Sequence, residues 1–164
     1  MSWLLGVVAV AALGGLAAWV MLGAMGRTAW RQQQGLPPLP PCPPARAAPA
    51  KLEAAGARYL GTTYAPSTVR RFSGYGLLGR AVVDLALGPA GLMVERGRAG
   101  AWCVPAAALR GAEVATHHAG KAVYAPRVLV VDWLLGSTRL RSGFVLSEPA
   151  AAEWASRLDT LVAR

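Results

Sequence analysis

A long stretch without charged side chains at the start of the chain constrains its architecture most. From Trp3 to Met25 the sequence runs for 23 residues that are almost entirely apolar. As a helix this stretch would be about 35 Å long, at roughly 1.5 Å per residue. The hydrocarbon core of a bilayer is about 30 Å thick, so the stretch can cross it with some tilt. We predict a transmembrane anchor over residues 1–26.

Two other interpretations of this stretch stay open, a cleaved signal peptide and a buried soluble helix. A signal peptide has a basic start, an apolar core of about 7–15 residues and a small residue at its cleavage site. Here no Lys or Arg precedes the apolar residues, although Ala24 could be the small residue. The pattern therefore favours a permanent anchor.

Flanking charge predicts the orientation of the anchor, because basic residues near a span tend to stay in the cytoplasm. The α-amino group of Met1 is the only basic group before the span. Five basic residues follow it, Arg27, Arg31, Arg46, Lys51 and Arg58. This predicts a single-pass protein of the cell (plasma) membrane with its N-terminus outside and its C-terminal domain in the cytoplasm. Small residues at spacing four, such as Ala11 and Gly15, make a homo-oligomer an alternative to a monomer.

Residues 27–56 form a second zone, a basic linker that holds seven of the 12 prolines. Proline favours the extended polyproline II conformation. At about 3.1 Å per residue, the run from Leu36 to Pro44 would hold the next domain about 25 Å from the bilayer. The alternative is a P-x-x-P docking peptide.

The two cysteines, Cys42 and Cys103, lack the spacing of a metal site. In a cytoplasmic domain they are expected to be free thiols, whereas a disulfide between them is conceivable if the domain is exported.

From residue 57 onward the pattern is that of short alternating strands separated by turns. Strands are expected at 58–64, 80–87, 92–96, 101–104, 111–118, 127–135 and 138–144. After Ser147, a candidate N-cap, apolar residues recur at helical spacing and include Trp154 and Leu158. We therefore predict a mainly β domain over 57–164, a bent antiparallel sheet or barrel of about seven strands capped by a C-terminal α-helix.

Several stretches of the sequence are similar to a known family. These are YLGTT, GPAGLMVER, VPAAALRGAEV with AGKAV after it, and LVVDWLLGSTRLRSGF. They resemble the pleckstrin-homology-like (PH-like) domain of small actinobacterial membrane proteins, a family without a defined function. The resemblance implies one N-terminal span, a short basic linker and a PH-like fold, and it covers nearly the whole chain.

Three arginines between the first two predicted strands are candidate contacts for anionic lipid headgroups or a partner: Arg70, Arg71 and Arg80. PH folds that bind phosphoinositides have a signature resembling K-x(n)-[KR]-x-R in this region. Here Ala81 and Val82 follow Arg80, so the second half of the signature is missing. A looser contact with acidic lipid is the hypothesis, and a solvated loop is the alternative.

No motif predicts chemistry, so we expect no enzyme, no catalytic residue, no cofactor and no metal site. The only histidines, His117 and His118, would point to opposite faces of a strand and are interpreted as solvated loop residues. Nucleic-acid binding is not expected either, because it requires a concentrated basic stripe with exposed aromatic residues. The aromatic residues here fall mostly on predicted core positions.

These observations predict a membrane-anchored cytoplasmic PH-like interaction module, an adaptor or accessory protein whose protein partner is unknown. The alternatives are a peripheral sensor of anionic lipid and an accessory subunit of an export or transport complex.

Overall fold

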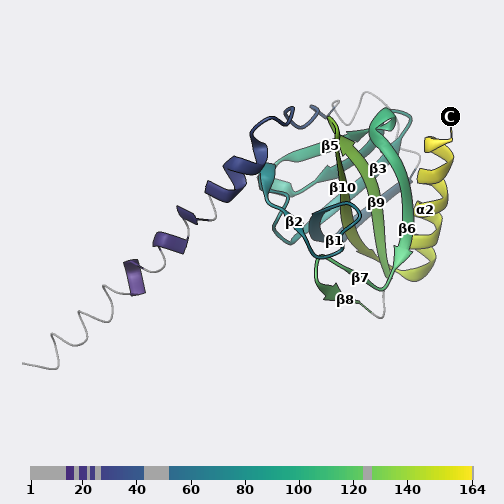
Figure 1. Cartoon of the computed structure of the whole chain (residues 1–164). Helices are drawn as coiled ribbons and strands as arrows, with labels where there is room; N and C mark the ends of the chain where they lie inside the picture. Colours follow the sequence, from purple (N-terminus) through teal and green to yellow (C-terminus); the bar gives the residue numbers. More distant parts are fainter. Residues whose placement is uncertain are drawn as a thin grey trace, which may run out of the picture.

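The computed structural model describes residues 14–16, 19–21, 23–24, 27–42, 52–123 and 127–163. In Figure 1 helical turns lead away from a β-rich domain, and the turns nearest to the domain form a helix over residues 27–33. Among the described residues, no helix is long and apolar enough to span a bilayer. Most of the predicted anchor over 1–26 lies outside these residues, so the anchor stays a prediction.

The domain is built on one antiparallel sheet whose main strands follow the order β5-β4-β3-β1-β10-β9-β6. The seven strands are β1 (Leu52–Tyr64), β3 (Ala81–Gly88), β4 (Gly91–Glu95), β5 (Ala101–Pro105), β6 (Leu109–Ala115), β9 (Arg127–Leu135) and β10 (Thr138–Leu146). The short β2 (Arg71–Phe72) pairs with β1, and β7 (His117–His118) pairs with β8 (Lys121–Ala122) as a separate hairpin. Each predicted strand overlaps an observed one, but β1 begins at Leu52, inside the segment predicted as linker, and the expected strand 111–118 is divided into β6 and β7.

The long strand β1 belongs to both halves of the sheet and bends it. Its first part pairs with β3, from Leu52 opposite Leu87, and its second part pairs with β10. The register with β10 shifts next to Gly61, whose φ of 119° lies in the region that favours glycine. The end strands β5 and β6 do not pair with each other, so the described strands form a bent sheet and not the closed barrel that was the other expectation.

One end of the bent sheet is covered by the helix α2 (Glu148–Val162), which lies along β6 in Figure 1. Ala151, Trp154 and Leu158 are buried, as their helical spacing predicted. Ser147 does precede the helix, but its side chain makes no capping hydrogen bond. The predicted PH-like order of strands followed by a capping helix is therefore the observed one.

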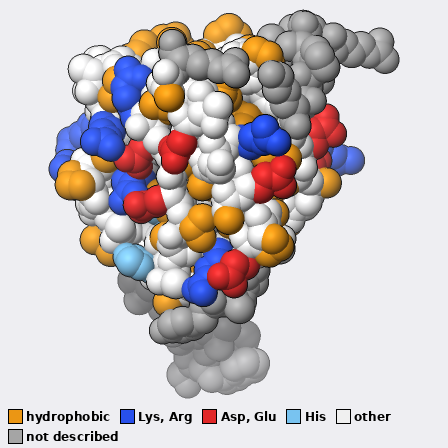
Figure 2. Space-filling view, turned by 90° about the vertical axis from the view of Figure 1, so that its right-hand side faces the viewer, with side chains coloured by type: hydrophobic (Ala, Val, Ile, Leu, Met, Phe, Trp, Pro, Cys, Tyr) orange, Lys and Arg blue, Asp and Glu red, His pale blue; other side chains and the backbone are white. Residues whose placement is uncertain are grey.

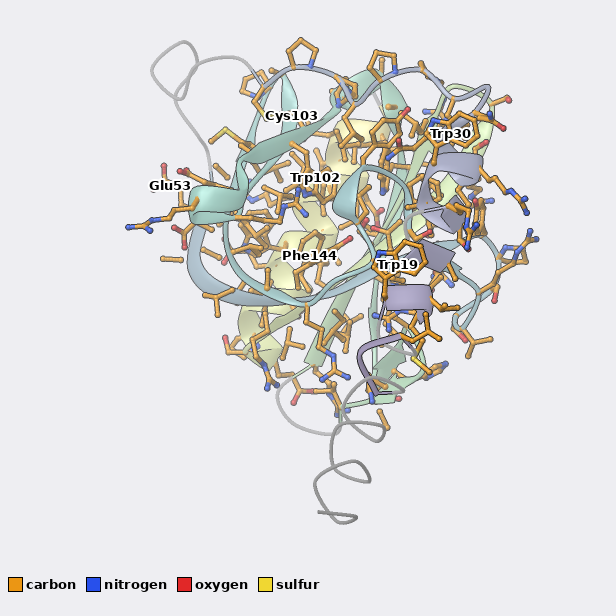
Figure 3. All side chains as sticks on the ribbon, turned by 90° about the vertical axis from the view of Figure 1, so that its left-hand side faces the viewer. Trp19, Trp30, Glu53, Trp102, Cys103 and Phe144 are labelled. Carbon is orange, nitrogen blue, oxygen red and sulfur yellow. A yellow bond between two sulfur atoms is a disulfide. The ribbon has the colours of Figure 1, made fainter. Side chains whose placement is uncertain are left out.

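Aromatic side chains fill the centre of the core. Trp102 is 1 % exposed and stacks on Trp133 with 5.5 Å between the ring centroids. Tyr59 and Phe144 also lie near Trp102, with centroid distances of 6.2 and 6.5 Å. Figure 3 shows Trp102 and Phe144 inside the domain. The core is thus held mainly by large rings from four different strands.

The described part of the proline-rich segment lies on the domain, in contrast to the free spacer that was expected for residues 36–44. Leu36 and Leu39 pack against the core, and the hydroxyl of Tyr75 donates a hydrogen bond to the carbonyl of Pro37 (3.0 Å). Burying these leucines removes apolar surface from water, which an extended spacer would leave exposed. The spacer prediction is therefore wrong for residues 36–42.

The cysteines also differ from the prediction for a cytoplasmic domain. Cys42 and Cys103 form a disulfide, with 5.1 Å between their Cα atoms. They are the only two cysteines of the chain, so neither is a free thiol. The docking of residues 36–42 brings Cys42 onto β5, where Cys103 lies, and no local pattern in the sequence predicts this docking.

Candidate functional site

The connection between β1 and β3, residues 65–80, carries the three arginines singled out from the sequence. Arg70 is exposed, and its guanidinium carbon lies 4.7 Å from the centroid of the Tyr64 ring. The hydroxyl of Ser67 accepts hydrogen bonds from the backbone N–H groups of Val69 and Arg70, at 3.2 and 2.9 Å. Arg70 is thus held at the surface by a cation–π contact worth about 0.5–1 kcal/mol.

Arg71 holds the connection against the sheet. Its Nη2 atom donates to the carbonyls of Leu60 and Leu78, both at 3.0 Å, and the residue is half-buried. The guanidinium packs over Gly61, where a Cβ atom would lie 3.0 Å from Nη2. These bonds engage Arg71 within the fold, so it is not one of the free contacts that the sequence suggested.

We expect Arg71→Gln to lower the free energy of unfolding by about 1–3 kcal/mol, because two backbone carbonyls lose a charged donor. Arg70→Gln removes an exposed side chain of the same type and should cost about 1 kcal/mol or less. Urea unfolding of residues 27–164 with each substitution measures both values. Equal losses for the two variants would contradict the structural role of Arg71.

Arg80 lies in a shallow pocket of about 400 Å³ with two other basic residues, Arg58 and Lys121. In the register of β1 with β3, Arg58 is opposite Val82, and both side chains are exposed on the outer face of the sheet. Val82 is 68 % exposed and also lines the pocket. Lys121 comes from β8, whose Ala122 also lines the pocket. Three cations and an exposed apolar side chain therefore surround one hollow.

Three basic side chains elsewhere on the domain, Arg127, Arg139 and Arg141, are paired with acids. Arg141 bonds to Asp132 (2.7 Å) and to Glu113, and Arg139 bonds to the same Asp132 (2.6 Å). Figure 2 shows Lys or Arg side chains interspersed with Asp and Glu on the face that carries α2. Within the part of the chain that the structure describes, the three pocket cations make no such ion pair. The pocket therefore gathers three cations that form no ion pair with a carboxylate among the described residues.

The β7–β8 hairpin that carries Lys121 is held to the sheet by His118. This side chain is 0 % exposed, and its Nε2 atom lies 3.1 Å from the carbonyl oxygen of Gly61. Its ring lies on Gly143, where a Cβ atom would be 2.4 Å from Cδ2. Gly143, which is opposite Gly61 in the register of β10 with β1, therefore makes the space for the imidazole.

Burial lowers the pKa of His118 to about 4, although the hydrogen bond to Gly61 acts in the opposite direction. The nearby charges of Arg141 and Arg71 lower the pKa further. The ring is therefore neutral at pH 7. The interpretation of both histidines as solvated is wrong for His118, whereas His117 is exposed.

The strand order, the capping helix and an open basic hollow beside the first strand pair define an interaction domain with a PH-like fold. A comparison with protein families agrees: residues 36–159 match the family Bacterial PH domain-like, and the chain belongs to this family. No curated protein and no solved structure matches the chain significantly. The family match does not test the actinobacterial origin or the membrane anchor, so both stay predictions.

The structure separates the three arginines predicted from the sequence. Arg80 lies in the pocket, Arg70 lies over Tyr64, and Arg71 is engaged by the backbone. Arg58 and Lys121 are the pocket residues that sequence reasoning did not select. Alternation along β1 could have placed Arg58 on the outer face with Val82, but no local pattern brings Lys121 to this face.

Proposed function

We propose that this chain is a membrane-anchored interaction module whose PH-like domain contacts anionic lipid headgroups through the basic pocket. The observation that carries the proposal is the convergence of Arg58, Arg80 and Lys121, without acidic partners among the described residues, on one open hollow. Anionic surfaces attract such clusters, with about 1 kcal/mol for each basic side chain near the surface. The apolar stretch of residues 3–25 would hold the pocket close to that surface.

The connection between the predicted anchor and the domain supports this placement. Gln32, at the end of the helix over 27–33, accepts hydrogen bonds from the backbone N–H and the hydroxyl of Ser73, at 2.6 and 2.8 Å. In Figure 1 the helical turns leave the domain near β2, and α2 lies on the far side. An anchor that continues this helix would therefore keep the connection 65–80 nearer to the bilayer than α2.

Such tethering compensates for weak binding. Three basic side chains supply only about 3 kcal/mol and little selectivity between headgroups. A tether converts the contact into an intramolecular event with a high effective concentration of lipid surface. The lipid contact would then orient the domain, and the anchor would provide most of the membrane affinity.

Vesicle binding of residues 27–164 tests the lipid contact without the anchor. We expect this fragment to co-sediment with vesicles that contain phosphatidylglycerol but not with neutral vesicles. Because salt screens the attraction, the bound fraction should decrease as the salt concentration increases. Changing Arg58, Arg80 and Lys121 together to Gln should weaken binding about 10- to 100-fold. A matched control changes Arg98, Arg110 and Arg157 to Gln, which removes the same charge from exposed sites outside the pocket.

An equal loss in both triple variants would mean that net charge, and not the pocket, attracts the vesicles. No binding by the unchanged fragment would contradict the lipid contact and favour the second candidate, an adaptor for a protein partner. The exposed side chain of Val82 among the cations is the observation that favours a protein, because apolar groups are buried at protein interfaces.

A further inference from the structure

The pairing of Cys42 with Cys103 connects the segment that follows the predicted anchor to the edge of the sheet. Trp102 and Val104, the neighbours of Cys103 in β5, are buried in the core, so Cys103 faces outward from the sheet. It is nevertheless only 7 % exposed. Figure 3 shows Cys103 at the edge of the domain. The separation of 5.1 Å between the two Cα atoms lies within the range that disulfides require.

Contacts other than the disulfide bond also hold the segment of residues 36–42 in place. Pro37 accepts a hydrogen bond from Tyr75 and packs against Gly136, where a Cβ atom would lie 3.0 Å from its Cδ. Leu36 and Leu39 pack on the core on either side of Pro37. The approach of Cys42 to Cys103 is therefore part of the fold, and oxidation would link two residues that the fold already brings together.

We infer that Cys42–Cys103 is a structural disulfide and that the PH-like domain stands on the oxidising, outer side of the membrane. Disulfides persist outside the cytoplasm, whereas cytoplasmic reductants keep thiols reduced. The opposite orientation predicted from charge depends mainly on Arg27 and Arg31, because basic residues count mostly within about 15–20 residues of a span. The pairing of both cysteines of the chain is stronger evidence for the orientation than these two arginines.

This inference does not depend on the lipid contact. It also holds whether residues 1–26 remain as an anchor or are removed as a signal peptide, because a cleaved signal peptide and an anchor with its N-terminus in the cytoplasm both place the domain on the outer side. The two proposals can therefore fail separately: vesicle binding tests the pocket, and thiol chemistry tests the side of the membrane.

Thiol labelling of the full chain in bacterial cells tests the inference. Cells that express the chain are quenched with acid, denatured and treated with a maleimide that carries a polyethylene glycol, which shifts the band for each free thiol. We expect no shift without reductant and two labels after reduction. Cys42→Ser and Cys103→Ser are matched controls, and each should take one label without reductant. Two labels on the unchanged chain without reductant would overturn the inference.

Reporters fused after Arg164 provide a second readout. Alkaline phosphatase, which is active only outside the cytoplasm, should be active, and a fluorescent protein that folds only in the cytoplasm should be dark. The reverse result would overturn the inference even if the thiols are protected from labelling.

Thermal unfolding of the purified full chain in detergent tests the structural role. The bond joins residues 61 positions apart, so reduction should lower the Tm by about 10–20 °C. An unchanged Tm after complete reduction would overturn the structural role.

Discussion

Replacing Trp102 by alanine should lower the free energy of unfolding by about 3–5 kcal/mol, which is a large part of the total stability of a domain of this size. The side chain is 1 % exposed and contacts Tyr59, Trp133 and Phe144 from β1, β9 and β10. Alanine would leave a cavity where both halves of the bent sheet meet. The surrounding rings come from rigid strands, so they can fill that cavity only in part.

Guanidinium unfolding of residues 27–164 measures the effect of Trp102→Ala, with Trp30→Ala as the matched control. Trp30 is 62 % exposed, so its loss should cost about 0.5 kcal/mol or less. Trp102→Phe keeps an aromatic ring in the core and should give an intermediate value. Similar values for Trp102→Ala and Trp30→Ala would show that the aromatic cluster is not the centre of stability.

Acidification should destabilise the domain through His118. The pKa of this group is about 4 in the folded state and 6.5 when it is unperturbed, so the unfolded chain binds the proton more tightly. Stability from the neutral ring is therefore fully present above pH 6.5 and is lost progressively as the pH falls toward 4. The difference between the two pKa values corresponds to a decrease of about 3 kcal/mol at most in the free energy of unfolding. The positive charges of Arg71 and Arg141 oppose protonation in the folded state.

Urea unfolding at pH 7.5 and pH 4.5 measures this loss, and two Gln substitutions separate it from the titration of carboxylates. His118→Gln should remove about 2–3 kcal/mol of the pH dependence, because amide side chains do not titrate in this range. His117→Gln changes the exposed neighbour and should retain the pH dependence of the unchanged fragment. The same pH dependence in all three proteins would contradict the assignment to His118.

The acid effect bears on the candidate site because His118 holds the hairpin that carries Lys121. Protonation of a buried imidazole favours opening of β7–β8, which would remove one wall of the pocket and move Lys121 away from Arg58 and Arg80. The protection factors of the amides over residues 117–122 should therefore fall at acidic pH before those of the main sheet fall.

Strand prediction succeeded where hydrophobic alternation was strong and turns were clear. Residues 127–135 are both the predicted strand and β9, because apolar residues alternate up to the turn at Gly136 and Ser137. It failed at the start of β1, where the stretch from Leu52 to Ala57 is short of strand-forming side chains. Pairing with β3 makes that stretch a strand, and such pairing is a tertiary effect.

The candidate site was only partly predictable from the sequence. Arg80 was selected because it belongs to a basic connection, and the structure places it in the pocket. Arg71 was selected for the same reason, but its position over Gly61 directs its donors to backbone carbonyls. Arg58 and Lys121 are distant from each other in the sequence and meet because the β7–β8 hairpin folds over β1.

The sequence by itself determined the apolar stretch of residues 3–25, the succession of strands and the capping helix, because these depend on composition and on periods of two or 3.6 residues. Only the tertiary structure decided that the proline-rich segment lies on the domain, that Cys42 meets Cys103, and that His118 is buried against Gly143. Each of these depends on contacts between residues far apart in the chain. Such contacts form because buried apolar surface and paired backbone groups outweigh the entropy of closing long loops.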